Sequence, residues 1–176
     1  VSNTGIPAAM MGMLQALPNT GLWHRLEKEG RLIQEQADAK GVNQTNLLNF
    51  VPTRPIRDIA NEYVDAFCRL YEPNAYIDRV KHYYLKMGEP RWKAFYRAEN
   101  SDKPAIPPLR ELRALAIVIW RQGMLRDTRW RFWNALITVA RRNPKTLEQF
   151  LVTLAHNEHF LEYRGIVTRE IQDQLA

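Results

Sequence analysis

Two histidines in one helical stretch, His156 and His159, are the residues best placed for metal chemistry. A spacing of three puts both imidazoles on one helix face, where a third ligand would complete a metal site. Glu158 lies between them, but zinc proteases use HExxH or HxxEH, and this sequence reads HNEH. We therefore predict structural histidines without a bound metal, and keep the metal-binding pair as the weaker alternative.

The segment from Trp120 to Arg142 interleaves arginines with tryptophans. Arginines can pair with phosphates while tryptophans stack on bases, and the net charge of +6 permits an anionic partner. In the competing interpretation the tryptophans face the core and the arginines face water. The helical spacing of Trp130, Trp133 and Ile137 favours this second interpretation. We therefore expect no nucleic-acid partner, with a basic nucleic-acid-binding or protein-interaction module as the alternative function.

Cys68 is the single cysteine of the 176 residues, so no internal disulfide can form. One thiolate cannot hold an iron–sulfur cluster, and the helical pattern around Cys68 predicts an inert, half-buried thiol. The sequence has no GxGxxG, GxxxxGK or GxSxG motif. We predict no catalytic residue in this chain. A lone cysteine fits a reducing compartment, so a soluble protein in the cytoplasm is expected.

The elements that must position these residues begin with a short apolar run from Ala8 to Leu17, which predicts a buried strand. A lone strand has no partner for its backbone groups, so we expect its sheet to lie outside this sequence. The chain begins with Val1, which also suggests a piece of a larger protein. After a Pro-Asn-Thr turn, Thr20 is expected to cap a short helix closed by a left-handed Gly30.

Residues 34–49 are polar and predict a linker, and the rest of the chain has helical periodicity. The longest apolar run, Leu115 to Trp120, is too short to span a bilayer and predicts a helix buried on most sides. The sequence thus predicts a mainly α protein, a compact multi-helix array with a short N-terminal strand-turn-helix unit. The first expected helices are 53–72, one capped by Asn74 and closed by Gly88, and 108–123. Three more follow: one from Asp127 or Thr128 to Asn143, one from a Thr146/Gln149 capping box to about Tyr163, and a last segment after a break at Gly165. Residues 89–108 are expected to be a loop held by its aromatic residues.

Residues 12–26, which read GMLQALPNTGLWHRL, and residues 29–32, which read EGRL, resemble the end of a radical SAM core. In that family a last barrel strand runs through a turn into a helix. Residues 49–52 and the turn from Leu70 to Val80 resemble the helical C-terminal domain of unknown function found in many cobalamin-binding radical SAM proteins. The resemblance implies three parts: the end of the core at 1–33, a linker at 34–49 and the helical domain at 50–176.

This resemblance implies a parent enzyme that uses an iron–sulfur cluster and S-adenosylmethionine, with cobalamin as a further candidate cofactor. Relatives with this layout look like methyltransferases acting on unactivated carbons of lipids or pigments such as hopanoids and bacteriochlorophylls. The family's CxxxCxxC motif is absent here, so no cofactor is expected in this chain. The implied partners are the N-terminal barrel of the parent chain and a small-molecule or lipid-like substrate, whose access the helical domain would shape. Four residues map near the barrel mouth and are speculative contacts for cofactor or substrate: Gln15, Pro18, Asn19 and Thr20.

Overall fold

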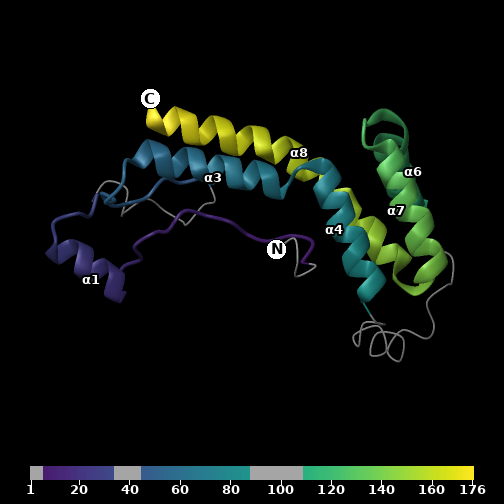
Figure 1. Ribbon diagram of the computed structural model, residues 1–176, viewed down its shortest axis with the longest axis horizontal. Helices are drawn as coiled ribbons and strands as arrows, with labels where there is room; N and C mark the ends of the chain where they lie inside the picture. Colours follow the sequence, from purple (N-terminus) through teal and green to yellow (C-terminus); the bar gives the residue numbers. More distant parts are fainter. Residues whose placement is uncertain (1–5, 34–44, 88–108) are drawn as a thin grey trace. The chain divides into compact units, whose positions relative to one another are not determined.

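The computed structural model describes residues 6–33, 45–87 and 109–176, and these form a mainly helical protein, as predicted (Figure 1). The chain divides into two compact units. Unit 1 comprises residues 1–9 and 72–160, and unit 2 comprises residues 10–71 and 161–176. No helix within the described ranges is both long enough and apolar enough to cross a membrane. The predicted closure at Gly88 and the predicted loop at 89–108 lie outside the described residues.

The predicted strand from Ala8 to Leu17 is wrong, because its described residues form no ladder with any neighbour. Extended pairing in the described chain is limited to one isolated bridge, between Leu32 and Phe50. The backbone of Ala16 pairs instead with a side-chain amide: its N–H donates to Asn49 Oδ1 at 2.8 Å, and its carbonyl accepts from Asn49 Nδ2 at 2.9 Å. At Ala16, a single asparagine therefore satisfies the two backbone groups that a neighbouring strand would have paired with.

The short helix after the turn is confirmed as α1, Gly21–Lys28. The Thr20 hydroxyl accepts from the Trp23 N–H at 3.3 Å, and Gly30 has the predicted left-handed φ of 65°. Beyond the undescribed part of the predicted linker, residues 45–50 are mostly buried. Gln174 holds them in place, since its Oε1 accepts from the Leu47 N–H and its Nε2 donates to the Thr45 carbonyl. The predicted boundaries at 33/34 and 49/50 stay predictions.

The helix α3, Ile56–Leu70, packs along the C-terminal part of α8, Leu147–Leu175 (Figure 1). Phe67 contacts the Tyr163 ring edge-on at 5.8 Å, and Gln172 donates to Asn61. The predicted break at Gly165 is wrong, because α8 continues through it without interruption. A glycine inside a helix costs only about 1 kcal/mol, which tertiary packing on α3 can offset.

The core of unit 1 forms where α4, Pro73–Lys86, packs on α7, Arg129–Arg142, and on the first part of α8. Glu72 caps α4 and Pro73 takes its first position, so the predicted Asn74 cap is wrong. The α7 helix begins after Thr128, as predicted. The aromatic, aliphatic and small side chains at this contact are fully buried: Tyr76, Ile77, Val80, Phe132, Ala135, Val139, Phe150 and Leu154.

The predicted capping box before α8 does not form. The Thr146 hydroxyl donates back to the Asn143 carbonyl at 3.0 Å, inside the short 3₁₀ turn η2, Pro144–Thr146. The partner residue of the box, Gln149, has a buried Oε1 without a hydrogen-bond partner among the described residues. A turn that continues directly into a helix thus replaces the expected cap.

The helix α6, Leu109–Trp120, continues into a π-helical turn, η1, Arg121–Leu125, before the chain enters α7. The predicted burial of Leu115 to Trp120 on most sides is wrong, because Ile117 and Trp120 are exposed. Gly123 does not end the helix but lies inside the π-turn. A Cβ there would lie 3.1 to 3.2 Å from the rings of Trp133 and Phe132, so glycine permits the close approach of η1 to α7.

Candidate functional site

Exposed apolar side chains surround the connection between α6 and α7, which we call the α6–α7 turn, residues 120–130. The exposed fractions are 59% for Trp120, 55% for Met124, 63% for Leu125 and 74% for Trp130. The interpretation that places these tryptophans in the core is therefore wrong. The helix α7 buries Phe132, Ala135 and Val139, and Trp130 falls on its opposite face.

Only part of the arginine set in this segment is neutralised. Arg126 forms two hydrogen bonds to the Glu158 carboxylate, and this pairing raises the pKa of Arg126. Arg131 pairs with Asp78. Four further arginines of the segment have no acidic partner among the described residues: Arg121, Arg129, Arg141 and Arg142. The segment therefore carries unpaired positive charge beside exposed apolar side chains.

Contacts to α7 and α8 fix the backbone of the π-turn. Trp133 donates its indole N–H to the Gly123 carbonyl at 2.9 Å. The fully buried Gln122 donates to the Leu154 carbonyl at 2.6 Å. The Arg126 N–H closes the turn on the Arg121 carbonyl at 3.1 Å. The backbone of the α6–α7 turn is thus held in one shape, although its outer side chains are exposed.

The histidine pair is exposed on α8. His156 Nδ1 lies 2.9 Å from the Val152 carbonyl, and the His159 ring lies 5.7 Å from that of Phe160. No group of three or more histidine, cysteine, aspartate or glutamate side chains in the described part of the chain is arranged to hold a metal. The expectation that this pair binds no metal stays a prediction.

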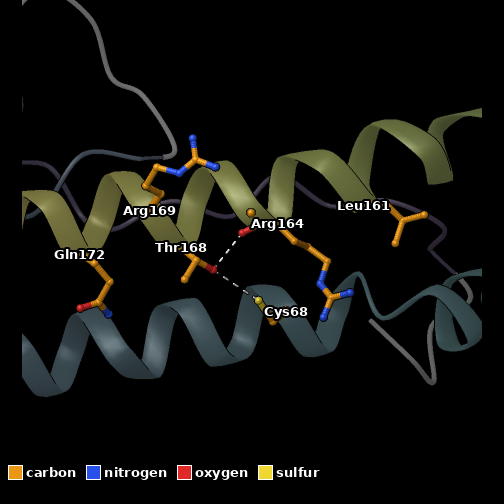
Figure 2. Close-up of a pocket in the computed structure, with 7 residues that line it drawn as sticks. Cys68, Leu161, Arg164, Thr168, Arg169 and Gln172 are labelled. Atoms are coloured by element: carbon orange, nitrogen blue, oxygen red, sulfur yellow. Dashed lines mark hydrogen bonds between the residues drawn. The ribbon is translucent and has the colours of Figure 1, made fainter.

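A shallow groove of about 460 Å³ runs along α8 and α3 in unit 2 (Figure 2). It is lined by Cys68 and by α8 residues including Arg164, Thr168, Arg169 and Gln172. The Thr168 hydroxyl donates to the Arg164 carbonyl at 2.9 Å and lies 3.9 Å from Cys68 Sγ. Sequence reasoning missed this groove, because the Cys68 and Thr168 positions are 100 residues apart. The guanidinium groups of Arg164 and Arg169 extend to opposite sides of α8, and the Thr168 hydroxyl already donates to a backbone carbonyl, so these groups do not converge on one ligand (Figure 2).

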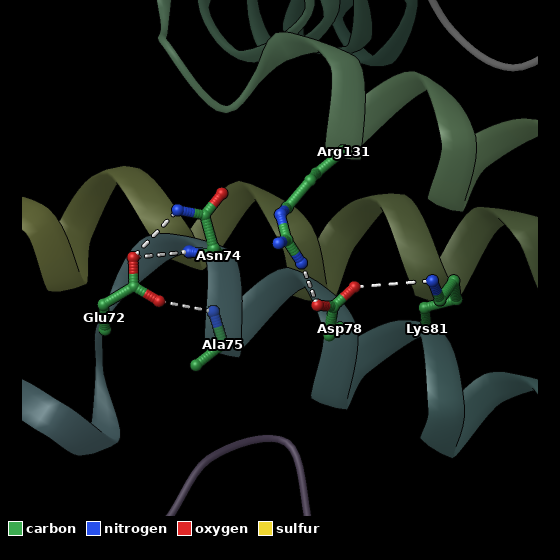
Figure 3. A network of polar contacts seen from close by, with 6 residues as sticks. All are labelled: Glu72, Asn74, Ala75, Asp78, Lys81 and Arg131. Carbon is green, nitrogen blue, oxygen red and sulfur yellow. Dashed lines mark hydrogen bonds and ion pairs between the residues drawn. The ribbon is translucent and has the colours of Figure 1, made fainter.

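A polar network joins α4 to α7 (Figure 3). Asp78 pairs with Arg131 and, at 3.4 Å, with Lys81. At the start of α4 the Glu72 carboxylate accepts from the backbone N–H groups of Asn74, at 3.1 Å, and Ala75, at 2.7 Å. These contacts orient one helix on another and cap a helix, so the network positions elements rather than substrate.

The four residues mapped to a barrel mouth lie in unit 2, and two of them already have structural partners. Gln15 Nε2 donates to the Leu47 carbonyl at 2.6 Å, and the Thr20 hydroxyl donates to the Leu17 carbonyl at 2.6 Å. Pro18 and Asn19 are exposed, and Asn19 has a left-handed φ of 64°. A role for these residues in cofactor or substrate contact stays a prediction.

Two curated relatives align with nearly the whole chain. The uncharacterized methyltransferase sll1242 of Synechocystis sp. is 53% identical over 173 residues, which cover 98% of this chain and 30% of that protein. The hopanoid C-2 methylase of Rhodopseudomonas palustris is 26% identical over 173 residues, covering 96% of this chain and again 30% of that protein. The chain therefore spans about a third of the length of these curated relatives, in their C-terminal part.

No solved structure matches the chain. One protein family does, and its match covers residues 20–173. This match confirms the predicted resemblance to a C-terminal domain of unknown function. The chain belongs to the DUF4070 family, domains of unknown function.

Proposed function

We propose that this chain is the accessory C-terminal domain of a methyltransferase of the cobalamin-binding radical SAM type. One observation carries the proposal: nearly the whole chain aligns with the C-terminal 30% of a methyltransferase at 53% identity. The second relative is named a hopanoid C-2 methylase, which supports a lipid-like substrate. The resemblance of residues 12–32 to the end of a radical SAM core supports the enzyme type.

In this proposal the cofactors belong to the rest of the parent protein. An iron–sulfur cluster needs several thiolates, and this chain supplies only Cys68, whose Sγ lies 3.9 Å from a threonine hydroxyl. The residues present do not fit the cluster, and no step of its chemistry is assigned to them. S-adenosylmethionine, and cobalamin where the parent uses it, are likewise proposed for the rest of the protein. A cytoplasmic location is part of the proposal, supported by the single cysteine, which fits a reducing compartment.

The N-terminal segment, residues 10–17, supplies a surface for the rest of the parent. Its backbone is hydrogen-bonded to the rest of unit 2 through Ala16 and Asn49, and Met13 and Ala16 are buried. On the outer side, Leu14 is 59% exposed and Leu17 is 48% exposed. The segment contains no charged residue, so an apolar protein surface suits it. The proposed partner is the N-terminal barrel, on which this domain packs to shape substrate access.

The test supplies the domain separately from the rest of its parent protein. The parent truncated before this region should transfer methyl groups poorly from S-adenosylmethionine to a hopanoid-type substrate, and adding the 176-residue chain should restore transfer. The Leu14→Asp/Leu17→Asp variant should restore it less well because its apolar surface is lost. Val152→Asp, at an equally exposed apolar position in unit 1, is the matched control. Full transfer by the truncated parent alone would refute the accessory role.

A second candidate function uses the α6–α7 turn, since both of its tryptophans are exposed and Arg121 and Arg129 are unpaired within the described structure. Nucleic-acid binding makes a specific demand: affinity for an oligonucleotide should fall steeply with salt. It should also be lost when Trp120 and Trp130, the side chains able to stack on bases, are replaced by serine. Weak binding that vanishes at physiological salt would reflect only the net charge of +6.

A further inference from the structure

The α6–α7 turn combines exposed large apolar side chains with unpaired positive charge. Trp120, Met124, Leu125 and Trp130 are all more than half exposed within eleven residues. Trp120 and Met124 are four apart on a continuous helical stretch, so they lie on one face, and Leu125 follows in the π-turn. An exposed cluster of large apolar side chains indicates a binding surface rather than a solvated one.

Positive charge borders this apolar cluster. Arg121 and Arg129 have no acidic partner among the described residues, and Asp127 is the sole acidic residue between positions 120 and 130. Arg141 and Arg142 lie at the far end of α7, roughly 20 Å along a helix of this length, and belong to another part of the surface. The turn is therefore complementary to a partner whose surface carries anionic groups and whose interior, just below that surface, is apolar.

We propose that the α6–α7 turn docks the protein on the surface of a bilayer containing anionic lipids. The indole rings of Trp120 and Trp130 enter the headgroup region, and Met124 and Leu125 reach the acyl boundary. Arg121 and Arg129 pair with lipid phosphates. This docking is peripheral and goes beyond the accessory role proposed above. It can be tested on the chain alone, so the two proposals can fail separately.

The composition of the turn favours a lipid surface over the alternative anionic partner. Nucleic acid would use the tryptophans for stacking and the arginines for phosphates, but it offers little apolar surface to Met124 and Leu125. A bilayer interface uses all three kinds of side chain. The π-turn also favours docking, because its contacts to Trp133 and Leu154 fix the backbone that carries these apolar side chains before any partner binds.

Vesicle flotation of the 176-residue chain tests the proposal. The chain should float with vesicles of phosphatidylcholine and phosphatidylglycerol, and less with phosphatidylcholine alone. The Trp120→Ser/Trp130→Ser variant should lose about tenfold or more of this partition, because its interfacial anchors are removed. Arg121→Gln/Arg129→Gln should lose the preference for the anionic lipid. Val152→Ser and Arg141→Gln/Arg142→Gln are the matched controls. They change an exposed apolar side chain on α8 and two exposed arginines at the far end of α7, unpaired among the described residues, and both variants should float as the wild type does.

Brominated lipids give a second readout, since they quench only tryptophans that enter the bilayer. The wild type should be quenched, and the double serine variant should not be, although it keeps its other three tryptophans. Circular dichroism confirms that each variant is folded. The proposal is overturned if the chain does not float, if the serine variant floats as well as the wild type, or if both vesicle types bind equally. Binding of an oligonucleotide without binding of vesicles, lost in the same variants, would assign the turn to nucleic acid instead.

Discussion

The N-terminal segment and the α6–α7 turn both expose large apolar side chains, but they differ in charge and in how their backbones are held. The N-terminal segment is uncharged and extended, and the side-chain amide of Asn49 satisfies the backbone of Ala16. The α6–α7 turn is helical, satisfies its own backbone and carries unpaired arginines. By exposure alone the two surfaces would be indistinguishable. They differ in charge: the uncharged N-terminal segment fits an apolar protein partner, and the α6–α7 turn with its arginines fits anionic lipid headgroups.

The largest expected effect is at Asn49, which holds the N-terminal segment. Asn49→Ala removes both hydrogen bonds to Ala16 and leaves buried backbone groups unpaired, so the free energy of unfolding should fall by about 2–3 kcal/mol. Urea denaturation measures it. Asn134→Ala, at an exposed asparagine on α7, is the control and should change stability by less than about 0.5 kcal/mol. An equally small effect at Asn49 would mean that the segment is not held as described.

The next effect concerns the support of the α6–α7 turn. Gly123→Ala should lower the free energy of unfolding by about 1–2 kcal/mol, because its Cβ would meet the rings of Trp133 and Phe132. Phe132 is fully buried and Trp133 is hydrogen-bonded, so neither ring can easily move away.

The matched control is Gly165→Ala, at an interior position of α8 where nothing lies within 4 Å of the added Cβ. This substitution should stabilise the protein by about 0.5–1 kcal/mol through helix propensity. Thermal melts of the two variants should therefore shift in opposite directions. A shift in the same direction would contradict the close packing of η1 on α7.

A smaller effect is expected from pH, at the tyrosine that meets the N-terminal segment. Burial raises the pKa of Tyr63 to about 12, and its hydroxyl donates to the Met11 carbonyl at 3.1 Å. Because the folded-state pKa lies above the ordinary value of 10.0, the stabilisation is complete below pH 10 and is lost as the pH rises toward 12. Denaturation midpoints should fall over this range, and Tyr63→Phe should reduce the fall. An unchanged pH dependence in that variant would rule out Tyr63 as the cause.

The smallest effect should come from the ion pair beside the α6–α7 turn. Arg126 and Glu158 pair at the surface, where such contacts contribute about 1 kcal/mol or less. Arg126→Gln should therefore lower stability by no more than this amount, as measured by urea denaturation. Vesicle flotation should change little, because Arg126 is already neutralised while Arg121 and Arg129 are not. A strong loss of flotation in this variant would mean that the paired arginine contacts lipid.

Local signals in the sequence predicted the parts of the fold that depend on neighbouring residues. The Thr20 cap and the left-handed Gly30 depend on residues within one helical turn. The start of α7 after Thr128 was also predicted, although the Thr128 hydroxyl forms no capping hydrogen bond. The apolar segment before Pro18 could not be assigned in this way, because its partner is the side chain of Asn49, 33 residues away from Ala16. Gly165 predicted a break because the packing of α8 on α3 cannot be seen in local sequence.

The candidate sites were less predictable than the helices. The periodicity around Trp130 and Trp133 indicates a helix, but it does not show which face a neighbour covers. The buried face is centred on Phe132, so Trp130 lies outside. The groove beside Cys68 combines residues 100 positions apart, beyond any local motif. The family, in contrast, was predicted from the resemblance of residues 12–26, 29–32, 49–52 and 70–80 to known proteins, and the family match confirms it. Such a resemblance does not depend on knowing which helix faces are buried.

Hydrogen exchange measured by mass spectrometry tests the difference between the two surfaces most directly. The 176-residue chain would be compared with the same chain bound to the rest of its parent protein, and with the chain on anionic vesicles. The account predicts that residues 10–17 gain protection only with the rest of the parent, and that residues 120–130 gain it only on vesicles. Protection of residues 120–130 by the rest of the parent, with none on vesicles, would contradict it.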